Sequence, residues 1–354
     1  MLDHQDDNGA KMYSDGSRGY FEDQIDRARN ALDGGDREVA LAIWDQTRRL
    51  FPKISAISKL AINLLLDLGS FDELLVIIEE GQKHYPGHAQ YAVGRAAISQ
   101  RRGDPQEALR LSEIVRRKFP DTIEGYTIAA ACLGKLGRPQ EAEAMITQAV
   151  HKFPNNFETL VEYARCAMSR HDWQKALQRW EETKRQFNQT TVSINIAECL
   201  RRLGRHDEAE EVAVDLSKQF PGNPWVFVEL AHIATAKGDL QSAIRYWEIA
   251  RNRNPYFASS YIEGAEAARK IGRNADADAI LIDGIARLKL DLDVHLEYAR
   301  NAERSGDFTA AIERWALVKQ RFPGCAEASQ KIGELAALYA NPFPPPHEPP
   351  KEGR

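Results

Sequence analysis

Four cysteines and several histidines are the residues of this sequence whose chemistry first suggests a catalytic or metal site. Cys132, Cys166 and Cys199 follow one another at nearly equal spacing, whereas Cys325 stands apart. Zinc needs four ligands at roughly 2 Å, and a disulfide needs Cα atoms closer than about 7 Å. Cysteine is also a small apolar residue that suits a tight helix interface. We interpret the first three as packing residues, and free thiols favour a reducing compartment.

The histidines do not form a catalytic or metal-binding pattern. His84 and His88 are four residues apart, but a Pro-Gly pair between them interrupts the helix that would align them. In His171-Asp172 and His206-Asp207 the pair falls at a turn, where helix capping accounts for the aspartate. The sequence has no glycine-rich phosphate loop, nucleophile elbow or paired-histidine zinc helix. We predict a chain that is not an enzyme and takes no cofactor or metal.

The elements that position these residues form a repeat. It is clearest from His295 to Gly324, which reads as two amphipathic helices joined by Ser-Gly-Asp and closed by Phe-Pro. A fixed period between about 20 and 50 residues is typical of a solenoid. The period between adjacent repeats is 34 residues, measured between the glycines that precede the second helix of each repeat. His171 stands in the one repeat that lacks this glycine. The glycines are Gly35, Gly69, Gly103, Gly137, Gly204, Gly238, Gly272 and Gly306.

This pattern resembles the tetratricopeptide repeat (TPR) family over about residues 21–340, in nine repeats. The shared features are the period, a small residue in the second helix, a closing proline, and an aromatic column made of Trp44, Trp180, Trp247 and Trp315. The resemblance implies an all-α fold, a right-handed superhelical solenoid of antiparallel helical hairpins. The first helix departs from the family in having Ala or Ile where glycine is common, as at Ala164 and Ile62.

The repeat also divides the chain. Residues 1–20 are polar and predicted to be disordered, residues 21–340 form the solenoid, and residues 341–354 form a proline-rich disordered tail. Residues 326–340 repeat only the first helix, and we expect them to cap the last apolar face.

Residue types at the predicted helix ends support these limits. The predicted N-caps of the second helices are Ser70 and five aspartates, namely Asp36, Asp104, Asp172, Asp239 and Asp307. Ser70 and Glu73 have the spacing of a capping box, and Pro105 and Pro139 fit the first helical position. The preceding glycines are predicted to be left-handed, a conformation that His171 must adopt with a side chain.

One repeat is a residue short, with the deletion between residues 188 and 204. Two interpretations stay open: a local change of geometry that acts as a hinge, or a shortened loop without consequence.

The resemblance implies that a ligand lies in the groove lined by the first helices. Positions three apart share a helix face, so two columns run side by side, with basic residues beyond them and with Trp225 opening one of the helices. The candidate groove residues are Glu162, Arg165, Arg201, Trp225, Glu229, His232, Glu263, Glu266, Arg269, Glu297, Arg300 and Arg304. They predict either a polar groove for a basic or mixed-charge segment, or salt-bridge ladders worth about 0–1 kcal/mol per exposed pair.

The family's carboxylate clamp is incomplete here. Lys59 and Asn63 match its first pair, but Gly94 replaces the next asparagine, and Glu124 and Ile128 stand where Lys and Arg belong. Binding of chaperone C-termini is therefore not expected. The groove of repeats 2–4 is instead apolar or small, which predicts a second surface for a helix; its residues are Ala56, Leu60, Val93, Ala97, Ile128 and Ala131.

Composition narrows the function. Net charge is −5 with 28% charged residues of both signs, which disfavours a dedicated nucleic-acid binder. No apolar run approaches the roughly 20 residues that cross a bilayer, and we expect a cytoplasmic protein. The predicted function is a non-catalytic scaffold or adaptor that binds a protein or peptide, its oligomeric state open. The alternatives are an accessory module of a bacterial glycosyl- or other transferase, and an RNA-processing scaffold of the half-a-TPR kind.

Overall fold

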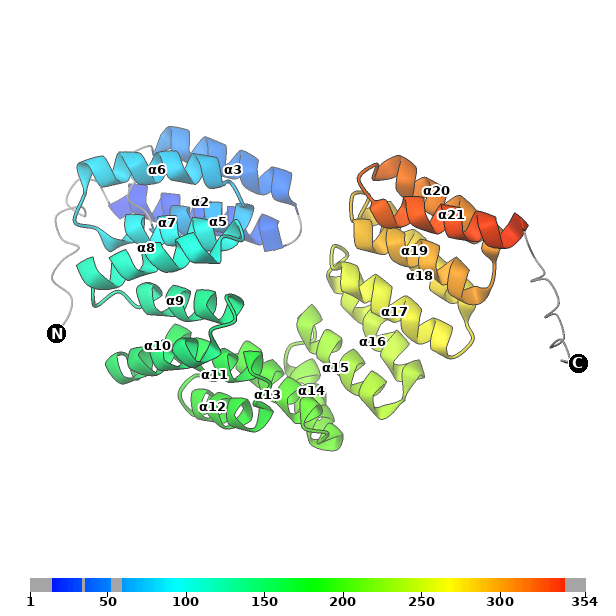
Figure 1. The fold of residues 1–354 in the computed structure, drawn as a ribbon. Helices are drawn as coiled ribbons and strands as arrows, with labels where there is room; N and C mark the ends of the chain where they lie inside the picture. Colours follow the sequence, from blue (N-terminus) through cyan, green and yellow to red (C-terminus); the bar gives the residue numbers. More distant parts are fainter. Residues whose placement is uncertain (1–14, 34–35, 52–58, 341–354) are drawn as a thin grey trace, which may run out of the picture. The chain divides into compact units, whose positions relative to one another are not determined.

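The computed structural model describes residues 15–33, 36–51 and 59–340 of the chain, and these residues form helices joined by short turns (Figure 1). The chain divides into two compact units, unit 1 ending at Gly204 and unit 2 beginning at Arg205. Within each unit, consecutive helices pack side by side as antiparallel hairpins. No strand occurs in the described ranges, so the all-α solenoid predicted from the repeat is confirmed.

Unit 1 contains the hairpins of the first five repeats and the first helix of the sixth. Its helices are α2 (Asp15–Asp33), α3 (Arg37–Leu50), α5 (Lys59–Leu68), α6 (Phe71–His84), α7 (Ala89–Arg101), α8 (Pro105–Lys118), α9 (Glu124–Lys135), α10 (Pro139–Lys152), α11 (Phe157–Ser169), α12 (Trp173–Gln186) and α13 (Thr190–Arg202).

Unit 2 continues with the second helix of the sixth repeat and ends with a single helix that packs on α20. Its helices are α14 (His206–Gln219), α15 (Pro224–Lys237), α16 (Leu240–Arg253), α17 (Ala258–Lys270), α18 (Asn274–Arg287), α19 (Leu292–Ser305), α20 (Phe308–Arg321) and α21 (Ala326–Ala340).

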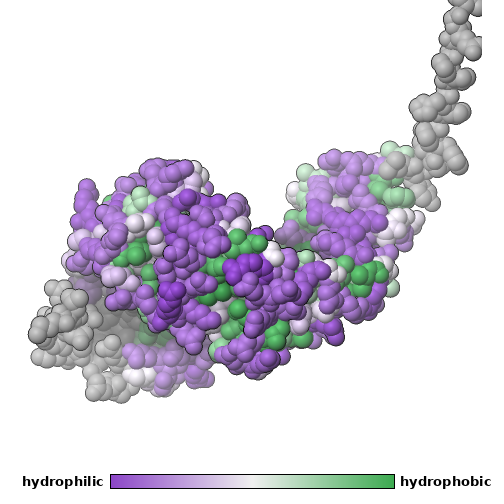
Figure 2. All heavy atoms as spheres, turned by 90° about the horizontal axis from the view of Figure 1, so that it is seen from below, coloured by the Kyte–Doolittle hydropathy of each residue, from purple (hydrophilic) through white to green (hydrophobic). Residues whose placement is uncertain are grey.

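The interior of each repeat is built from the predicted aromatic and small columns. Trp44, Trp180, Trp247 and Trp315 are buried, with at most 1% of each residue exposed. The small residue four positions earlier, such as Ala176 before Trp180, is fully buried and lets the neighbouring helix approach. Removing one such tryptophan is expected to cost about 3–5 kcal/mol. On the face drawn in Figure 2, the molecular surface is mostly hydrophilic and has small hydrophobic patches.

Helix ends follow the predicted chemistry with one exception. The five aspartates each accept a hydrogen bond from a backbone N–H of the first turn. Seven of the landmark glycines have positive φ, and His171 joins them at φ 58°. The predicted capping box at Ser70 is wrong, because Ser70 makes no side-chain cap hydrogen bond. Glu73 instead accepts from the indole Nε1 of Trp44 at 2.8 Å and pairs with Arg48, so a contact to the neighbouring hairpin has replaced the local one.

Two predicted boundaries change. Helix α2 begins at Asp15, six residues before the expected start of the first repeat, so the part of residues 1–20 from Asp15 on is helical. The missing residue of the short repeat lies in the connection between α12 and α13, where Phe187, Asn188 and Gln189 separate the helices. The interpretation of that site as a hinge remains a prediction.

Some expectations fall outside the described residues: Gly35, Pro52, Ala56, residues 1–14 and the tail at 341–354. Cys132, Cys166 and Cys199 are buried, as expected of packing residues, and burial raises the pKa of the Cys132 thiol. Among the helices that the structure describes, none is both long and apolar enough to cross a membrane.

Candidate partner-binding surface

The first helices of the repeats in unit 2, together with the terminal helix, present one continuous face. Helices α15, α17, α19 and α21 follow one another, and α17 contacts α19 directly. The predicted column at the sixth position of these helices runs through Glu229, Glu263 and Glu297. Continued onto α21, the same position holds Lys331, so the acidic column ends in a cation.

His232 connects α15 to α17 at one end of this face. Its Nε2 lies 3.0 Å from a carboxylate oxygen of Glu263, and its Nδ1 lies 3.7 Å from Glu229, which is buried. The ring also packs edge-on against Trp247, with centroids 5.0 Å apart. Burial alone would lower the pKa of His232, but hydrogen bonds and charge from both glutamates outweigh it and raise the pKa to about 9. This histidine is therefore a cation at neutral pH that compensates two carboxylates of the column.

Farther along the face, one glutamate of α17 and one of α19 are paired within their own helix. Glu266 accepts from Lys270 at 2.8 Å, and this hydrogen bond lowers the pKa of Glu266. Buried Glu297 accepts a hydrogen bond from Arg304. The buried glutamates of the column are thus paired with cations, so the column is less acidic than its sequence alone indicates.

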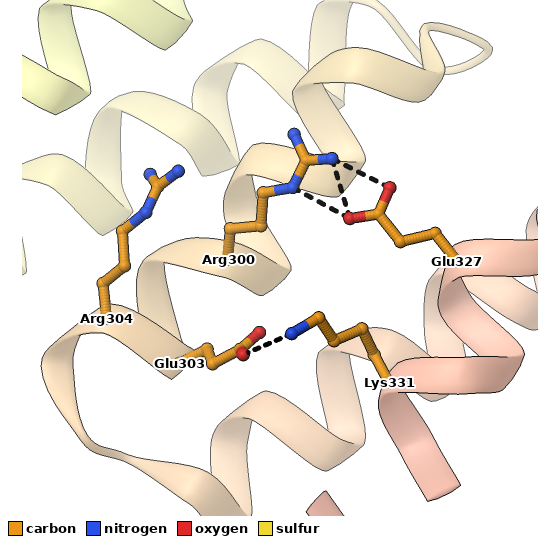
Figure 3. Close-up of a pocket in the computed structure, with 5 residues that line it drawn as sticks. All are labelled: Arg300, Glu303, Arg304, Glu327 and Lys331. Carbon is orange, nitrogen blue, oxygen red and sulfur yellow. Dashed lines mark hydrogen bonds and ion pairs between the residues drawn. The ribbon is translucent and has the colours of Figure 1, made fainter. Parts of the chain in front are cut away.

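The C-terminal end of the face has a pocket of about 390 Å³ between α19 and α21 (Figure 3). We call it the charged pocket; its lining consists of Arg300, Glu303, Arg304, Glu327 and Lys331. Arg300 donates two hydrogen bonds at 2.8 Å to the two oxygens of Glu327, and Lys331 donates to Glu303 at 2.8 Å. Figure 3 shows both pairs bridging the two helices, with the Arg304 guanidinium extending separately.

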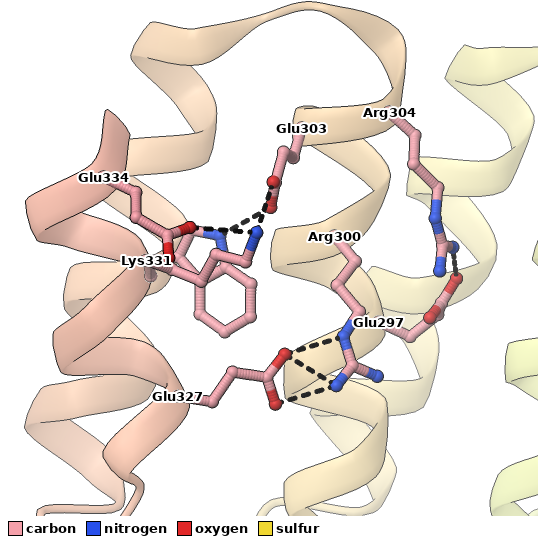
Figure 4. Close-up of polar contacts among 8 residues, drawn as sticks. Glu297, Arg300, Glu303, Arg304, Glu327, Lys331 and Glu334 are labelled. Carbon is pink, nitrogen blue, oxygen red and sulfur yellow. Dashed lines mark hydrogen bonds and ion pairs between the residues drawn. The ribbon is translucent and has the colours of Figure 1, made fainter. Parts of the chain in front are cut away.

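Additional contacts fix the orientation of these side chains. Lys331 also pairs with Glu334 at 3.3 Å, and Glu303 accepts a weak hydrogen bond from the buried indole of Trp315 at 3.4 Å (Figure 4). The hydrogen bond to Glu303 raises the pKa of Lys331. The pocket therefore contains both positive and negative side chains, and each of its two ion pairs joins α19 to α21.

The remaining predicted groove residues are not part of the lining of this pocket. In unit 1, Glu162 is half-buried, so loss of water raises its pKa against the influence of exposed Arg165, and Arg201 lies 4.0 Å from Glu198. In unit 2, Trp225 is 46% exposed and packs edge-on against Phe257 at the start of α15. The Nε of Arg269 is buried without a hydrogen-bond partner among the described residues.

Sequence reasoning missed Glu303, Glu327 and Lys331. Residues 326–340 were predicted only to cover an apolar face, so the prediction did not include the polar side of the same helix. The available signal was the column itself, since Lys331 stands one repeat after Glu297.

The apolar surface predicted for repeats 2–4 is partly interior. Val93 and Ala97 are half-buried and pack against a cluster that contains Ile128 and Cys132. Leu60 packs likewise against the core that contains Leu64 and its neighbours. These side chains stabilise the stack, and little of them is left for a ligand.

Comparison with known proteins places this architecture. Residues 135–193, which include α10, α11 and α12, match the tetratricopeptide repeat family. No curated protein matches the chain by sequence. The resemblance to tetratricopeptide-repeat proteins is confirmed by this match together with the helical-hairpin fold.

Three solved structures show the same fold at low identity. The Cut9–Hcn1 hetero-tetramer of the APC/C matches with 17% identity and a TM-score of 0.53, over 84% of this chain and 59% of that one. The human IFIT1 dimer with PPP-AAAA matches with 16% identity and a TM-score of 0.53, over 90% and 85%. A tetratricopeptide repeat protein from Parabacteroides merdae ATCC 43184 matches with 13% identity and a TM-score of 0.50, over 70% and 98%. The fold is in general that of a protein-interaction scaffold.

Proposed function

We propose that this protein is a non-catalytic scaffold that binds a mixed-charge segment of a partner protein against α19 and α21. The observation that carries the proposal is the charged pocket, a hollow of about 390 Å³ whose lining among the described residues is entirely charged. A hollow of this kind selects a ligand by charge rather than by apolar contact, because the side chains that reach the ligand are guanidinium, ammonium and carboxylate groups.

Binding would proceed by exchange of ion pairs. Arg300, Glu327, Glu303 and Lys331 remain between about a quarter and two fifths exposed, so their mutual pairs are partly screened by water. Such pairs contribute about 0–1 kcal/mol each, and a partner can replace one at little cost. Arg304 also lines the pocket, where it pairs with Glu297 (Figure 4). A partner carboxylate would therefore bind Arg304 or Lys331, and a partner ammonium group would bind Glu303 or Glu327.

The test is quantitative affinity purification with the double variant Arg304→Glu and Lys331→Glu. The control is Arg245→Glu, an exposed change on α16 that alters net charge without touching the pocket. We expect partners recovered with the wild type to be lost with the double variant and kept with the control. Retention of every partner by the double variant would contradict the proposal.

A nucleic-acid ligand is the competing possibility, because the solved structure of human IFIT1 holds PPP-AAAA. The net charge of −5 and the alternation of signs in the charged pocket argue against a polyanion here. We expect no shift in the fluorescence anisotropy of a labelled 5′-triphosphate oligoadenylate at moderate salt. Salt-dependent binding with micromolar affinity would favour the RNA-processing scaffold over the protein scaffold.

We further propose that the protein works in the cytoplasm, either alone or as an accessory module of a transferase. Three buried free cysteines support a reducing compartment. Cell fractionation tests the location, and recovery outside the cytoplasm would contradict it. Transferase activity that co-purifies with the wild type and is lost with the double variant would identify the accessory role.

A further inference from the structure

A second hollow of unit 2 lies among α18, α19 and α20. Its volume is about 490 Å³, and it shares no lining residue with the charged pocket. We call it the aliphatic cleft, because Ile282, Ile285, Leu317 and Val318 form most of its wall, together with Tyr298. The two helices that frame it, α18 and α20, are second helices of adjacent repeats.

Two of these side chains are unusually exposed for their size. Ile282 is 52% and Leu317 57% accessible to water. A third large aliphatic residue, Leu290, is 82% exposed and follows Lys289, whose carbonyl accepts a hydrogen bond from the cleft residue Arg321 at 2.7 Å. Two exposed aliphatic side chains that line one hollow, with a third next to a residue bonded to its lining, favour an interaction site, whereas single ones need no explanation.

The repeat itself does not require apolar residues at these positions. Helices α10 and α12 occupy in unit 1 the places of α18 and α20, and they hold Thr147 where α18 has Ile282 and Glu182 where α20 has Leu317. At the position of Ile282, four other second helices hold glutamate, namely Glu79, Glu113, Glu181 and Glu248. The interior is equivalent in both units, so the aliphatic surface is an addition to the repeat.

The charges on the cleft are of one sign. Arg314 and Arg321 belong to its lining, and none of the described lining residues is a carboxylate. Arg314 is engaged with Asp278 and with the carbonyl of Tyr298. Arg321 donates its Nε to the carbonyl of Lys289, and its side chain is exposed. A ligand that complements this surface brings apolar side chains flanked by carboxylates.

We propose that the aliphatic cleft docks an amphipathic helix of a partner protein, with leucine-like residues on one face and Asp or Glu beside them. A helix is the shape that fits a groove between two neighbouring helices, where it places apolar anchors at three- and four-residue spacing. The site is separate from the charged pocket and does not depend on the function proposed for it.

The experiment pans a phage library of random 16-residue peptides against the full-length protein, with counter-selection against the Leu317→Glu variant. We expect enrichment of sequences with apolar residues at helical spacing and acidic residues between them. Enrichment of basic sequences, of sequences without helical periodicity, or of none would overturn the proposal.

The winning peptide is then titrated by fluorescence anisotropy. Leu317→Glu and Ile282→Glu are each expected to weaken binding by about tenfold or more, as for central contacts of an interface, and Arg321→Glu by a smaller factor that vanishes at high salt. Thr147→Glu, at the equivalent place in unit 1, is the matched control and leaves affinity unchanged. Equal affinity for all variants would overturn the proposal.

Two other occupants give distinct results. If a second copy fills the cleft, sedimentation shows a dimer that Leu317→Glu converts to a monomer. If residues 341–354 of the same chain fill it, their removal strengthens peptide binding several-fold. Either result would overturn the assignment to a partner helix.

Discussion

The two units contain the same buried ion-pair cluster and differ in what surrounds it. In unit 1, Arg179 binds Glu143 of α10 and the carbonyl of Tyr163, and its guanidinium stacks 3.4 Å from the centre of the Tyr163 ring. In unit 2, Arg314 binds Asp278 and the carbonyl of Tyr298, and it stacks 3.9 Å from that ring. We call these the Arg179 cluster and the Arg314 cluster.

Their differences lie in depth and in the neighbouring surface. The Arg179 side chain is 4% exposed and that of Arg314 is 14%. One turn farther along the helix, α12 places exposed Glu182 and α20 places exposed Leu317. The comparison teaches that the repeat keeps the interior contact that joins two hairpins and varies the exposed residues beside it. Recognition is therefore expected at the varied positions of unit 2.

The largest expected effect is that of Arg179→Met. It leaves Glu143 half-enclosed without its closest cation, although Lys175 and Arg170 remain at 3.1 and 3.4 Å. Removing one member of a buried pair costs about 3–5 kcal/mol. Urea denaturation should show a loss at the lower part of that range, with hydrogen exchange locating it in α10 to α12. A loss under about 1 kcal/mol would mean that the Arg179 cluster does not hold the hairpins together.

Arg314→Met sharpens the comparison, because its cluster is more exposed to water. Asp278 keeps a hydrogen bond from Asn301 at 2.8 Å, so we expect a cost of about 1–3 kcal/mol, smaller than that of Arg179→Met in the same assay. A larger cost in unit 2 than in unit 1 would contradict the ranking by burial.

Acid should distinguish Glu143 from ordinary surface glutamates. Burial alone would raise the pKa of Glu143, but hydrogen bonds from Arg179 and Lys175 outweigh it and lower the pKa to about 2. Because the folded-state pKa is below the unfolded value, the stabilisation is present above about pH 4.5 and is lost as the pH falls toward 2. The urea midpoint of the wild type should fall over this range more steeply than that of Glu143→Gln, and equal slopes would exclude the cluster as the cause.

Alkali should act on unit 2 through His232. Its pKa of about 9 lies above the unfolded value of 6.5, so its stabilisation is complete below about pH 6.5 and is lost as the pH rises through 9. The C2 proton of His232 in an NMR titration should report a midpoint near 9, with His232→Gln assigning the signal. A midpoint near 6.5 would mean that Glu229 and Glu263 do not hold the imidazole in its charged form.

The smallest effects concern helix caps. Asp104 accepts a hydrogen bond from the N–H of Glu107 at 3.0 Å, so Asp104→Ala should cost about 1 kcal/mol. Ser70 makes no such bond, so Ser70→Ala should be nearly neutral by urea denaturation. A cost for Ser70→Ala equal to that of Asp104→Ala would restore the capping box that the sequence suggested.

These caps also show how far the sequence predicts the structure. Positive φ at the glycines and burial of Trp44 follow from residue types at fixed spacing, so they could be read without coordinates. Glu73 could not be placed, since its partner Trp44 lies in the previous hairpin and competes with the local N–H groups. The Arg179 and Arg314 clusters were missed because each joins three helices, although an arginine directly before the buried tryptophan marks both.

The same reasoning explains the candidate site. The columns on the first helices remain a predicted binding face, and that prediction left out the charges of their neighbours on α21. Whether a column binds a ligand or pairs internally depends on which charges the next helix supplies, and Lys331 and Glu327 supply them here.

Hydrogen–deuterium exchange of the full chain, with and without a partner recovered by affinity purification, tests most directly the claim that recognition belongs to the surface of unit 2. The account predicts slower exchange in α19 and α21 on binding, with α11 and α13 of unit 1 unchanged. Protection confined to α11 and α13, or spread evenly over both units, would contradict it.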